Sequence, residues 1–434
     1  MTATLPLLEV RDLSVAFGAT SAVKQVSFAL DRGETLALVG ESGSGKSVSA
    51  LAILQLLPYP DARHPSGGIR LRGEELLGAT PARLREVRGN QIAMVFQEPM
   101  TSLNPLHSIE KQIGETLALH KGLSGARLRA RIRELLELVG LPDAAQRLNA
   151  LPHELSGGQR QRVMIAMALA NEPDILIADE PTTALDVTIQ AQILKLLKDL
   201  QSRFGMAILF ITHDLSIVRK MADRVCVMRA GEVVESGAVA DLFANPRHPY
   251  TRQLLAAEPR GEPPPEIADA PDVMVGEGLK VWFPLKRGVL RRVVDHVKAV
   301  DGVDVSVREG QTLGVVGESG SGKTTLGLAL LRLLASEGAI RFKGRRIDGM
   351  GSSALRPLRK AMQIVFQDPF GSLSPRLSVG EIVEEGLLVH GLAGDHAARR
   401  ARISQALEEV GLDPATQDRY PHEFSGGQRQ RIAI

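Results

Sequence analysis

Eight consecutive residues near the N-terminus combine glycines with one lysine and one hydroxyl, a composition suited to binding phosphate. They fit the pattern GxxxxGK[ST] and directly follow the strand-like run LALV. The residues are Gly40, Glu41, Ser42, Gly43, Ser44, Gly45, Lys46 and Ser47. Glycines let backbone amides converge on phosphate oxygens, and the following helix presents its positive end. Lys46 would neutralise the β- and γ-phosphates of a nucleotide and Ser47 would coordinate Mg²⁺, so the segment predicts a phosphate loop.

A second phosphate loop repeats every element of the first. It consists of Gly317, Glu318, Ser319, Gly320, Ser321, Gly322, Lys323 and Thr324. Lys323 and Thr324 would take the roles of Lys46 and Ser47. Two full copies, each after a strand-like run, favour nucleotide binding over glycine turns without a ligand.

Two acids, Asp179 and Glu180, end the apolar run 175–178. At the tip of a strand, Asp179 could hold the shell of a Mg²⁺ ion while Glu180 polarises an attacking water. Acids at strand ends are also common structural features, so this pair alone does not decide the chemistry.

The elements that would position these residues occur twice in the same order. LALVGESGSGKS returns as LGVVGESGSGKT, IAMVFQEPMTSLNP as MQIVFQDPFGSLSP, and PHELSGGQRQRVMI as PHEFSGGQRQRIAI. We therefore predict two domains, residues 1–257 and 275–434. The linker between them is residues 258–274, because its prolines disfavour helices and central strands and its acids favour solvent.

Each copy is predicted to have an α/β fold. Short β-rich stretches such as LEVRDLSVAF suggest an antiparallel subdomain that leads into the first core strand. The apolar runs 175–178 and 206–211 alternate with helical stretches such as 189–204, which indicates a largely parallel core sheet. Residues 97–156 have a helical pattern and predict a helical subdomain.

The most specific motif stands before a helical run in each copy. Its residues are Ser156, Gly157, Gly158 and Gln159 in the first copy and Ser425, Gly426, Gly427 and Gln428 in the second. A helix N-terminus of this kind suits an anion. Together with the preceding leucine, the first motif resembles the signature of ABC ATPases. The resemblance implies that each signature faces the γ-phosphate held by the opposite domain, so that ATP is sandwiched between the two domains.

Other landmarks of that family match in order and spacing. The resemblance makes Gln97 the Q-loop residue, 183–186 the D-loop and His213 the switch histidine, although a lone histidine at a strand end is more often structural. It gives catalytic roles to Glu180, His213 and Gln97. It also implies stacking of adenine on Phe17 and Phe283, either of which could instead be a core residue. The Mg²⁺ ligands that we expect are Ser47, Gln97 and Asp179 in the first copy and Thr324 and Gln367 in the second.

Composition constrains the partners. The 52 lysines and arginines nearly balance 50 aspartates and glutamates, which gives no global sign of nucleic-acid binding. The single cysteine, Cys226, forbids an intrachain disulfide, suits a reducing cytoplasm and is expected to be a small core residue. No apolar run approaches the roughly 18 residues of a membrane span, so any membrane process requires docking to other chains.

Further details resemble the oligopeptide, dipeptide and nickel importer branch. They are QEPMTSLNP, QDPFGSLSP and the segment NPRHPYT at residues 245–251, which by itself is only a proline-stiffened turn. Within that branch the fused arrangement resembles Yej-type subunits linked to peptides and microcin C, and the glutathione importer ATPase is the second alternative. The resemblance implies two integral-membrane permease subunits, an extracytoplasmic solute-binding protein, and a location on the cytoplasmic face of the bacterial inner membrane. We expect no iron–sulfur cluster and no nucleic-acid partner.

Other groups of ABC proteins are alternatives to an importer subunit. Tandem ABC proteins of translation carry a long, charged helical linker, and those of DNA repair carry zinc-binding cysteine clusters; neither feature occurs in this sequence. An exporter or a pure regulator is less favoured, because the sequence has branch-specific motifs and no fused membrane domain.

The second copy of the repeat is shorter than the first. Ile434 pairs with Ile165, so the counterparts of Asp179, Glu180 and His213 are missing from the second copy. We expect a truncated second domain, from an incomplete gene or fragment rather than a deliberately shortened protein. The first phosphate loop would then face Ser425–Gln428, while the second would face Ser156–Gln159 without a catalytic glutamate.

Overall fold

The computed structural model divides the chain into two units, residues 1–260 and 261–434. It describes residues 5–97, 102–141, 143, 148–183, 185–257, 261–262, 269–288, 291–392 and 394–434, apart from the side chains of residues 369 and 370. Most of the predicted linker and part of the segment after Gln97 lie outside these residues. Each unit is described by itself.

Unit 1 opens with an antiparallel sheet in the order β2-β1-β5-β6, with β4 paired to β1. Its strands are β1 (Leu8–Phe17), β2 (Thr20–Leu30), β4 (Ala62–Arg63), β5 (Gly68–Leu71) and β6 (Glu74–Glu75). Apolar side chains of β1 and β2, such as Leu13 and Val26, are fully buried. This sheet is the antiparallel subdomain that the sequence predicts.

The second sheet of unit 1 is mixed, with the order β11-β10-β3-β9-β8-β7. Its strands are β3 (Thr35–Val39), β7 (Ile92–Val95), β8 (Ile175–Asp179), β9 (Ala207–Thr212), β10 (Arg224–Arg229) and β11 (Glu232–Ala238). All neighbours pair in parallel except β10 and β11. The carboxyl ends of β3, β7, β8 and β9 therefore lie at one edge of the sheet, which is where ligands bind in open α/β sheets.

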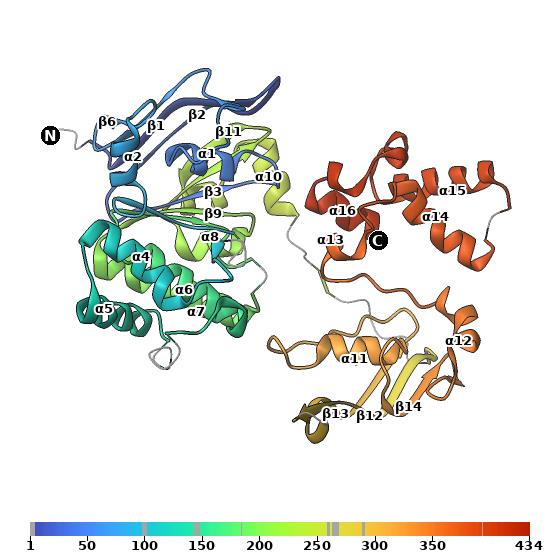
Figure 1. The fold of residues 1–434 in the computed structure, drawn as a ribbon. Helices are drawn as coiled ribbons and strands as arrows, with labels where there is room; N and C mark the ends of the chain where they lie inside the picture. The colour runs from blue at the N-terminus through green and yellow to red at the C-terminus, as the bar shows by residue number, and fades with distance from the viewer. Residues whose placement is uncertain are drawn as a thin grey trace. The chain divides into compact units, whose positions relative to one another are not determined.

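Helices accompany the two sheets of unit 1, and those within residues 97–156 belong to the predicted helical subdomain. They are α1 (Lys46–Ile53), α2 (Pro81–Val87), α4 (Ile109–Lys121), α5 (Gly125–Leu138), α6 (Gly157–Ala168), α7 (Val187–Phe204), α8 (Leu215–Met221), α9 (Val239–Ala244) and α10 (Pro249–Ala256), with a 3₁₀ turn η2 (Pro152–Glu154). Figure 1 shows β1 and β2 at one end of unit 1 and α4 to α7 at the other, with β3 and β9 between them. The expected helical region between Gln97 and Ser156 is thus present.

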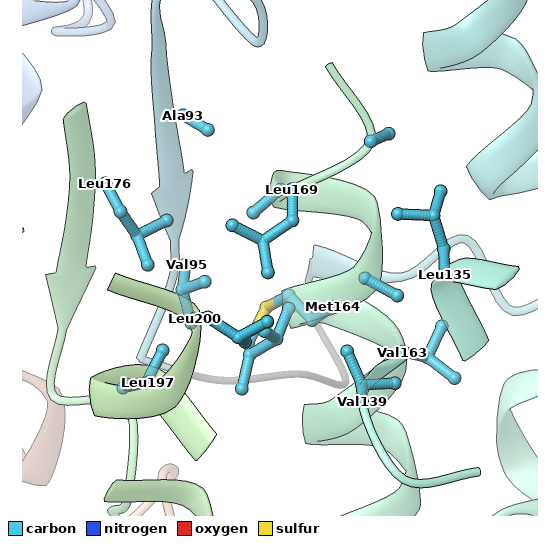
Figure 2. Close-up of a cluster of buried hydrophobic side chains, with 14 of the residues drawn as sticks. Ala93, Val95, Leu135, Val139, Val163, Met164, Leu169, Leu176, Leu197 and Leu200 are labelled. Carbon is cyan, nitrogen blue, oxygen red and sulfur yellow. The ribbon is translucent and has the colours of Figure 1, made fainter. Parts of the chain in front are cut away.

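A hydrophobic core ties the helical subdomain to the site-bearing strands. Figure 2 shows Met164 of α6 and Leu169, the residue that ends this helix, in one buried cluster with Val95 of β7 and Leu135 of α5. Leu176 of β8 and the α7 residues Leu197 and Leu200 belong to the same cluster, and all of these side chains are nearly or fully buried. Because helix α6 begins within the signature motif, this packing fixes the signature relative to β7 and β8.

Unit 2 contains an antiparallel sheet in the order β13-β12-β14-β15. Its strands are β12 (Asp272–Arg287), β13 (Arg292–Arg308), β14 (Glu337–Phe342) and β15 (Arg345–Arg346). Two helices accompany this sheet, α11 (Lys323–Leu330) and α12 (Ser352–Arg359). Leu326 and Ala329 of α11 pack with Leu279 of β12 and Ile340 of β14 in one apolar cluster.

The rest of unit 2 is helical. It comprises α13 (Pro369–Ser372), α14 (Val379–His390), α15 (His396–Glu409) and α16 (Gly426–Ala433), with 3₁₀ turns η3 (Pro414–Asp418) and η4 (Pro421–Glu423). Val379 of α14, Ile403 and Leu407 of α15 and Ile432 of α16 share a buried cluster. These helices repeat the order of α4, α5 and α6 in unit 1.

The α/β class is confirmed, but the second copy differs from the expectation in one respect. Residues 313–316 and 364–366, which match β3 and β7, form no strand. In unit 1, β3 pairs with β9 and β10, and β7 pairs with β8. The described part of unit 2 supplies no strands in the places of β8, β9 and β10, and Val316 is 91% exposed. The expectation of a mixed core sheet in each copy is therefore met in unit 1 and is wrong for these residues of unit 2.

Candidate nucleotide-binding and hydrolysis site

The first phosphate loop connects β3 to α1 at the carboxyl edge of the mixed sheet. Gly43 and Gly45 adopt the left-handed region with φ of 81° and 97°, which costs glycine no steric energy. A Cβ at Gly45 would lie 2.8 Å from the Ala22 carbonyl oxygen, so this loop also packs closely against β2. Gly43 and Gly45 were predicted to let backbone amides converge on phosphate. The backbone conformation of the loop also requires glycine at both positions.

Lys46 is buried at the first turn of α1. Its ammonium donates to the carbonyl oxygens of Gly40 and Glu41, each at 2.8 Å, and to the Ser44 hydroxyl at 3.3 Å. Burial lowers the pKa of Lys46, although the carboxylates of Glu180, Asp179 and Glu41 act in the opposite direction. The loop thus holds the Lys46 ammonium against its own backbone. Phosphate oxygens of a bound nucleotide would replace these carbonyl oxygens as acceptors.

Ser47 and Asp179 meet at the next position. The Ser47 hydroxyl donates to Asp179 Oδ1 at 3.0 Å, and Asp179 is 5% exposed. Burial raises the pKa of Asp179 to about 6, despite the hydrogen bond from Ser47. Oxygen donors of this kind suit Mg²⁺, which is usually held by one or two carboxylates together with substrate phosphates. The paired oxygens of Ser47 and Asp179 fit the predicted ion.

The Glu180 carboxylate contacts three other side chains of the site. Its Oε2 accepts hydrogen bonds from Gln97 Nε2 at 3.0 Å and from the Thr183 hydroxyl at 2.9 Å. Its Oε1 lies 3.1 Å from His213 Nδ1. Two of the predicted site residues, Gln97 and His213, therefore both contact the third, Glu180. The three residues follow three different strands.

The protonation states follow from these contacts. Burial acts to raise the pKa of Glu180, but the hydrogen bonds from His213 and Thr183 and the charges of His213 and Lys46 outweigh it, so the pKa lies below its ordinary value. The hydrogen bond to Glu180 raises the pKa of His213. Glu180 is thus held as a carboxylate at neutral pH, the form that can accept a proton from water.

The backbone of Glu180 is itself unusual. Its φ is +45°, in the left-handed region that non-glycine residues seldom adopt. Its amide donates to the Ile211 carbonyl oxygen at 2.9 Å, so β9 holds the residue in this conformation. Such strain is found at functional sites, where the surrounding structure fixes it.

The two signature motifs have matching local structures. Ser156 caps α6: its hydroxyl accepts from the Gln159 amide at 3.3 Å, and its own amide donates to Gln159 Oε1 at 3.0 Å. Ser425 and Gln428 form the same reciprocal bonds at the start of α16. In both copies the motif forms a helix N-terminus, as the sequence predicts, and its glycines lie in the first turn of the helix.

Three other predicted positions have structural roles as well. Asp186 of the D-loop caps α7 by accepting from the Ile189 amide at 2.9 Å, while Ala184 of that loop lies outside the described residues. Phe17 ends β1 half-buried against the apolar cluster beneath it. Phe283 lies on β12 and is 43% exposed.

The second phosphate loop has the same internal bonding as the first. Lys323 donates to the carbonyl oxygens of Gly317 at 2.7 Å and Glu318 at 2.6 Å, and to the Ser321 hydroxyl at 3.4 Å. Thr324 and Gln367, the remaining predicted Mg²⁺ ligands, are both exposed. The structure shows no carboxylate bonded to Thr324 in the described part of the chain.

Two contacts of the site were missed by the sequence analysis. Thr183 was assigned only to the D-loop pattern, yet its hydroxyl binds Glu180. Tyr250 belongs to the NPRHPYT segment, yet its hydroxyl accepts a hydrogen bond from the Glu41 amide at 3.2 Å. The spacing of three between Glu180 and Thr183 could have suggested the first contact, whereas no local signal reveals the second, which spans 209 residues.

Comparison with known families decides the class of the protein. The model of the family described as "ABC transporter" matches residues 23–183 and 300–434. The chain belongs to the ABC transporter family. Both matched segments begin within the antiparallel sheets, before the phosphate loops, which confirms the predicted tandem arrangement. The chain is an ATP-binding protein of this family, an ATPase whose hydrolysis is coupled to transport.

Curated relatives match almost the whole chain. "Peptidoglycan transport ATP-binding protein YejF" of Agrobacterium fabrum is 66% identical over 437 residues, covering 100% of this chain and 80% of the relative. "Uncharacterized ABC transporter ATP-binding protein YejF" of Escherichia coli is 55% identical, covering 99% and 82%. "Glutathione import ATP-binding protein GsiA" of Salmonella paratyphi A is 49% identical, covering 99% and 74%. The resemblance to both Yej-type and glutathione-importer ATPases is confirmed.

Two remaining predictions concern the cysteine and the membrane. Cys226 is buried in β10, where burial raises the pKa of its thiol to about 12, as expected of a core residue. Within the ranges that the structure describes, no helix is long and apolar enough to cross a bilayer.

Proposed function

We propose that this chain energises an importer of peptides or peptide-like solutes by hydrolysing ATP at the first phosphate loop. The hydrolytic part rests on one observation: Glu180 is a carboxylate in contact with Gln97, Thr183 and His213, beside Lys46 and Asp179. The peptide part is supported by the Agrobacterium relative, whose name specifies peptidoglycan transport, together with the branch motifs of the sequence.

Each residue has a defined task in the proposed reaction. Loop amides and Lys46 would bind the β- and γ-phosphates, and Phe17 would stack on the adenine. Ser47, Asp179 and Gln97 would hold Mg²⁺, which when bound would offset the charge of the phosphates. Glu180 would orient a water and accept its proton as the oxygen attacks the γ-phosphorus. The bond to the β–γ bridging oxygen then breaks and ADP leaves.

His213 would support this step from the other side of Glu180. Because the hydrogen bond between the two raises the pKa of His213, the imidazole can carry a positive charge near the γ-phosphate. Its hydrogen bond also holds the Glu180 carboxylate in one orientation. We therefore assign His213 to orienting the base and stabilising negative charge.

We extend the proposal to the second copy through the family resemblance. Ser425–Gln428 would complete the first site, and Ser156–Gln159 would complete a second one with Lys323, Thr324, Gln367 and Phe283. A helix N-terminus offers amide donors to the γ-phosphate in each case.

The proposed partners are two permease subunits in the bacterial inner membrane, with an extracytoplasmic solute-binding protein acting through them. This chain would dock peripherally on the cytoplasmic side through residues 97–106 and 367–377. Residues 98–101 of the first segment lie outside the described residues. Glutathione import is the second candidate substrate class, supported by the name of the Salmonella relative.

Uptake into proteoliposomes tests the substrate class. The chain would be co-reconstituted with its permease subunits and binding protein, and the uptake of labelled short peptides compared with that of labelled glutathione. We expect ATP-dependent peptide uptake that excess unlabelled peptide abolishes. Uptake of glutathione without peptides would select the second candidate, and ATP hydrolysis unaffected by either solute would contradict both.

A further inference from the structure

The NPRHPYT segment, a stiff turn by its sequence, reaches the phosphate loop. It leads into α10, and the side chain of Tyr250 points beneath the loop with only 2% of the residue exposed. The Glu41 amide donates to the Tyr250 hydroxyl at 3.2 Å. A residue beyond the last strand of the mixed sheet therefore touches the second residue of the loop.

The Glu41 amide belongs to a peptide group that is bonded at both ends. Its nitrogen donates to Tyr250, while its carbonyl oxygen, that of Gly40, accepts from the Lys46 ammonium at 2.8 Å. One planar peptide thus joins the tyrosine hydroxyl to the cation that would bind phosphate. Hydrogen bonds arranged in such a chain polarise one another in a site of low dielectric.

The backbone at Gly40, which begins this peptide, also packs closely against β10. Gly40 has a φ of +150°, and a Cβ there would lie 2.2 Å from the Met228 carbonyl oxygen of β10. The position therefore requires glycine, and rotation of the peptide plane would break the bond to Tyr250 or the bond to Lys46.

Tyr250 is itself anchored to the sheet. Its ring lies against Arg229, whose guanidinium carbon is 4.8 Å from the ring centroid. Its amide donates to His248 Nδ1 at 3.2 Å. The Glu235 carboxylate of β11 accepts from the amides of Arg247 at 2.8 Å and His248 at 3.0 Å. The hydroxyl is therefore a fixed acceptor rather than a mobile one.

We propose that Tyr250 is a positioning residue of the first nucleotide site, whose hydroxyl fixes the Gly40–Glu41 peptide and thereby the Lys46 ammonium. This role deepens the proposed function, because it rests on ATP binding at the first phosphate loop. Tyr250 makes no contact with the phosphates itself; it acts through Lys46.

Tyr250→Phe removes the hydroxyl and keeps the buried ring. All variants carry Lys323→Ala, so that the second phosphate loop does not mask the result. The affinity of the full chain for ATP with Mg²⁺ is measured by calorimetric titration. We expect a two- to tenfold loss, about that of one hydrogen bond. Tyr59→Phe, which removes the hydroxyl of an exposed tyrosine that bonds to Gln55 and His64, is the control and should leave ATP affinity unchanged.

A double-mutant cycle with Lys46→Ala separates positioning from a general structural effect. ATP is raised to millimolar concentrations so that weak binding stays measurable. If Tyr250 acts through Lys46, Tyr250→Phe costs less than about twofold once Lys46 is absent. Equal losses in both backgrounds, or no loss beside intact Lys46, would overturn the proposal. Failure of the Lys323→Ala parent to bind ATP would instead count against the first phosphate loop as a nucleotide site.

Discussion

The Ser47 hydroxyl donates a hydrogen bond to Asp179 Oδ1 at 3.0 Å. This bond joins the phosphate loop to the end of β8, 132 residues further along the sequence. Asp179 is buried, and this burial raises the pKa of its carboxyl to about 6. At neutral pH Asp179 is therefore a carboxylate in surroundings that disfavour its charge. A divalent cation is the partner that would relieve this cost.

Asp179→Asn should stabilise the nucleotide-free chain while abolishing its Mg²⁺-dependent hydrolysis. Because the folded pKa exceeds the ordinary 3.8, folded Asp179 binds its proton more tightly, and the free energy of unfolding falls as pH rises through about 6. The variant lacks this penalty, so we expect it to gain about 1–3 kcal/mol at pH 8 and little at pH 4. Urea denaturation at both pH values measures the difference.

The exposed Asp199 of α7 supplies the matched control. Asp199→Asn should leave the free energy of unfolding within about 0.5 kcal/mol of the wild type at both pH values. A gain for Asp179→Asn that grows toward acid pH would contradict the assigned sign.

Thr183→Val should lower turnover while leaving the KM for ATP nearly unchanged. The substitution keeps the shape of the side chain but removes the hydroxyl that holds Glu180 Oε2 at 2.9 Å. We expect a two- to tenfold loss in kcat, about the value of one hydrogen bond. Thr183→Ser, which retains the hydroxyl, should recover most of the rate; equal losses in both variants would point to packing instead.

Lys46→Ala should weaken ATP binding itself. The variant removes the cation at the mouth of the loop, and hydrogen bonds to charged groups contribute about 1.5–3 kcal/mol, so we expect at least a tenfold rise in Kd. Equilibrium titration with ATP and Mg²⁺ in the Lys323→Ala background tests this. Lys195→Ala, on the exposed side of α7, should bind like its parent. Unchanged affinity in Lys46→Ala would remove the residue from the site.

Docking to the permease can be tested by cysteine crosslinking from Leu106, which is 84% exposed near the end of the predicted docking segment. The only native cysteine, Cys226, is buried and has a raised thiol pKa, so it will not compete. Leu106→Cys should crosslink to a permease subunit in the assembled transporter. Leu5→Cys, before β1 at a position that is 78% exposed, should not form this crosslink. The reverse pattern in an active complex would place the interface elsewhere.

The parts of the site that depend on local sequence were the predictable ones. The strand, loop and helix from β3 to α1 follow from a short apolar run and a glycine-rich pattern. The roles of Gln97 and His213 came from the family resemblance, and the parallel pairing of β7, β8 and β9 brings both residues to Glu180. These predictions needed no knowledge of distant contacts.

The parts that depend on distant partners were not predictable. Residues 313–316 have the local pattern of a core strand. A strand forms only when neighbouring strands pair with it, and the described residues of unit 2 include no counterparts of β9 and β10. The contact of Tyr250 with Glu41 depends on how α10 returns to the sheet, which the spacing of NPRHPYT does not encode. The positive φ of Glu180 is likewise set by β9 rather than by its own sequence.

ATP turnover by Glu180→Gln in the assembled transporter tests the central claim most directly. The variant keeps the size of the side chain but cannot accept the proton of water, so turnover should fall about 100-fold or more. Its Kd for ATP should stay within about threefold of wild type, because Glu180 acts on the water and not on the bound nucleotide. The exposed Glu86→Gln of α2 should behave as wild type. Near-normal turnover in Glu180→Gln would contradict the assignment of Glu180 as the base.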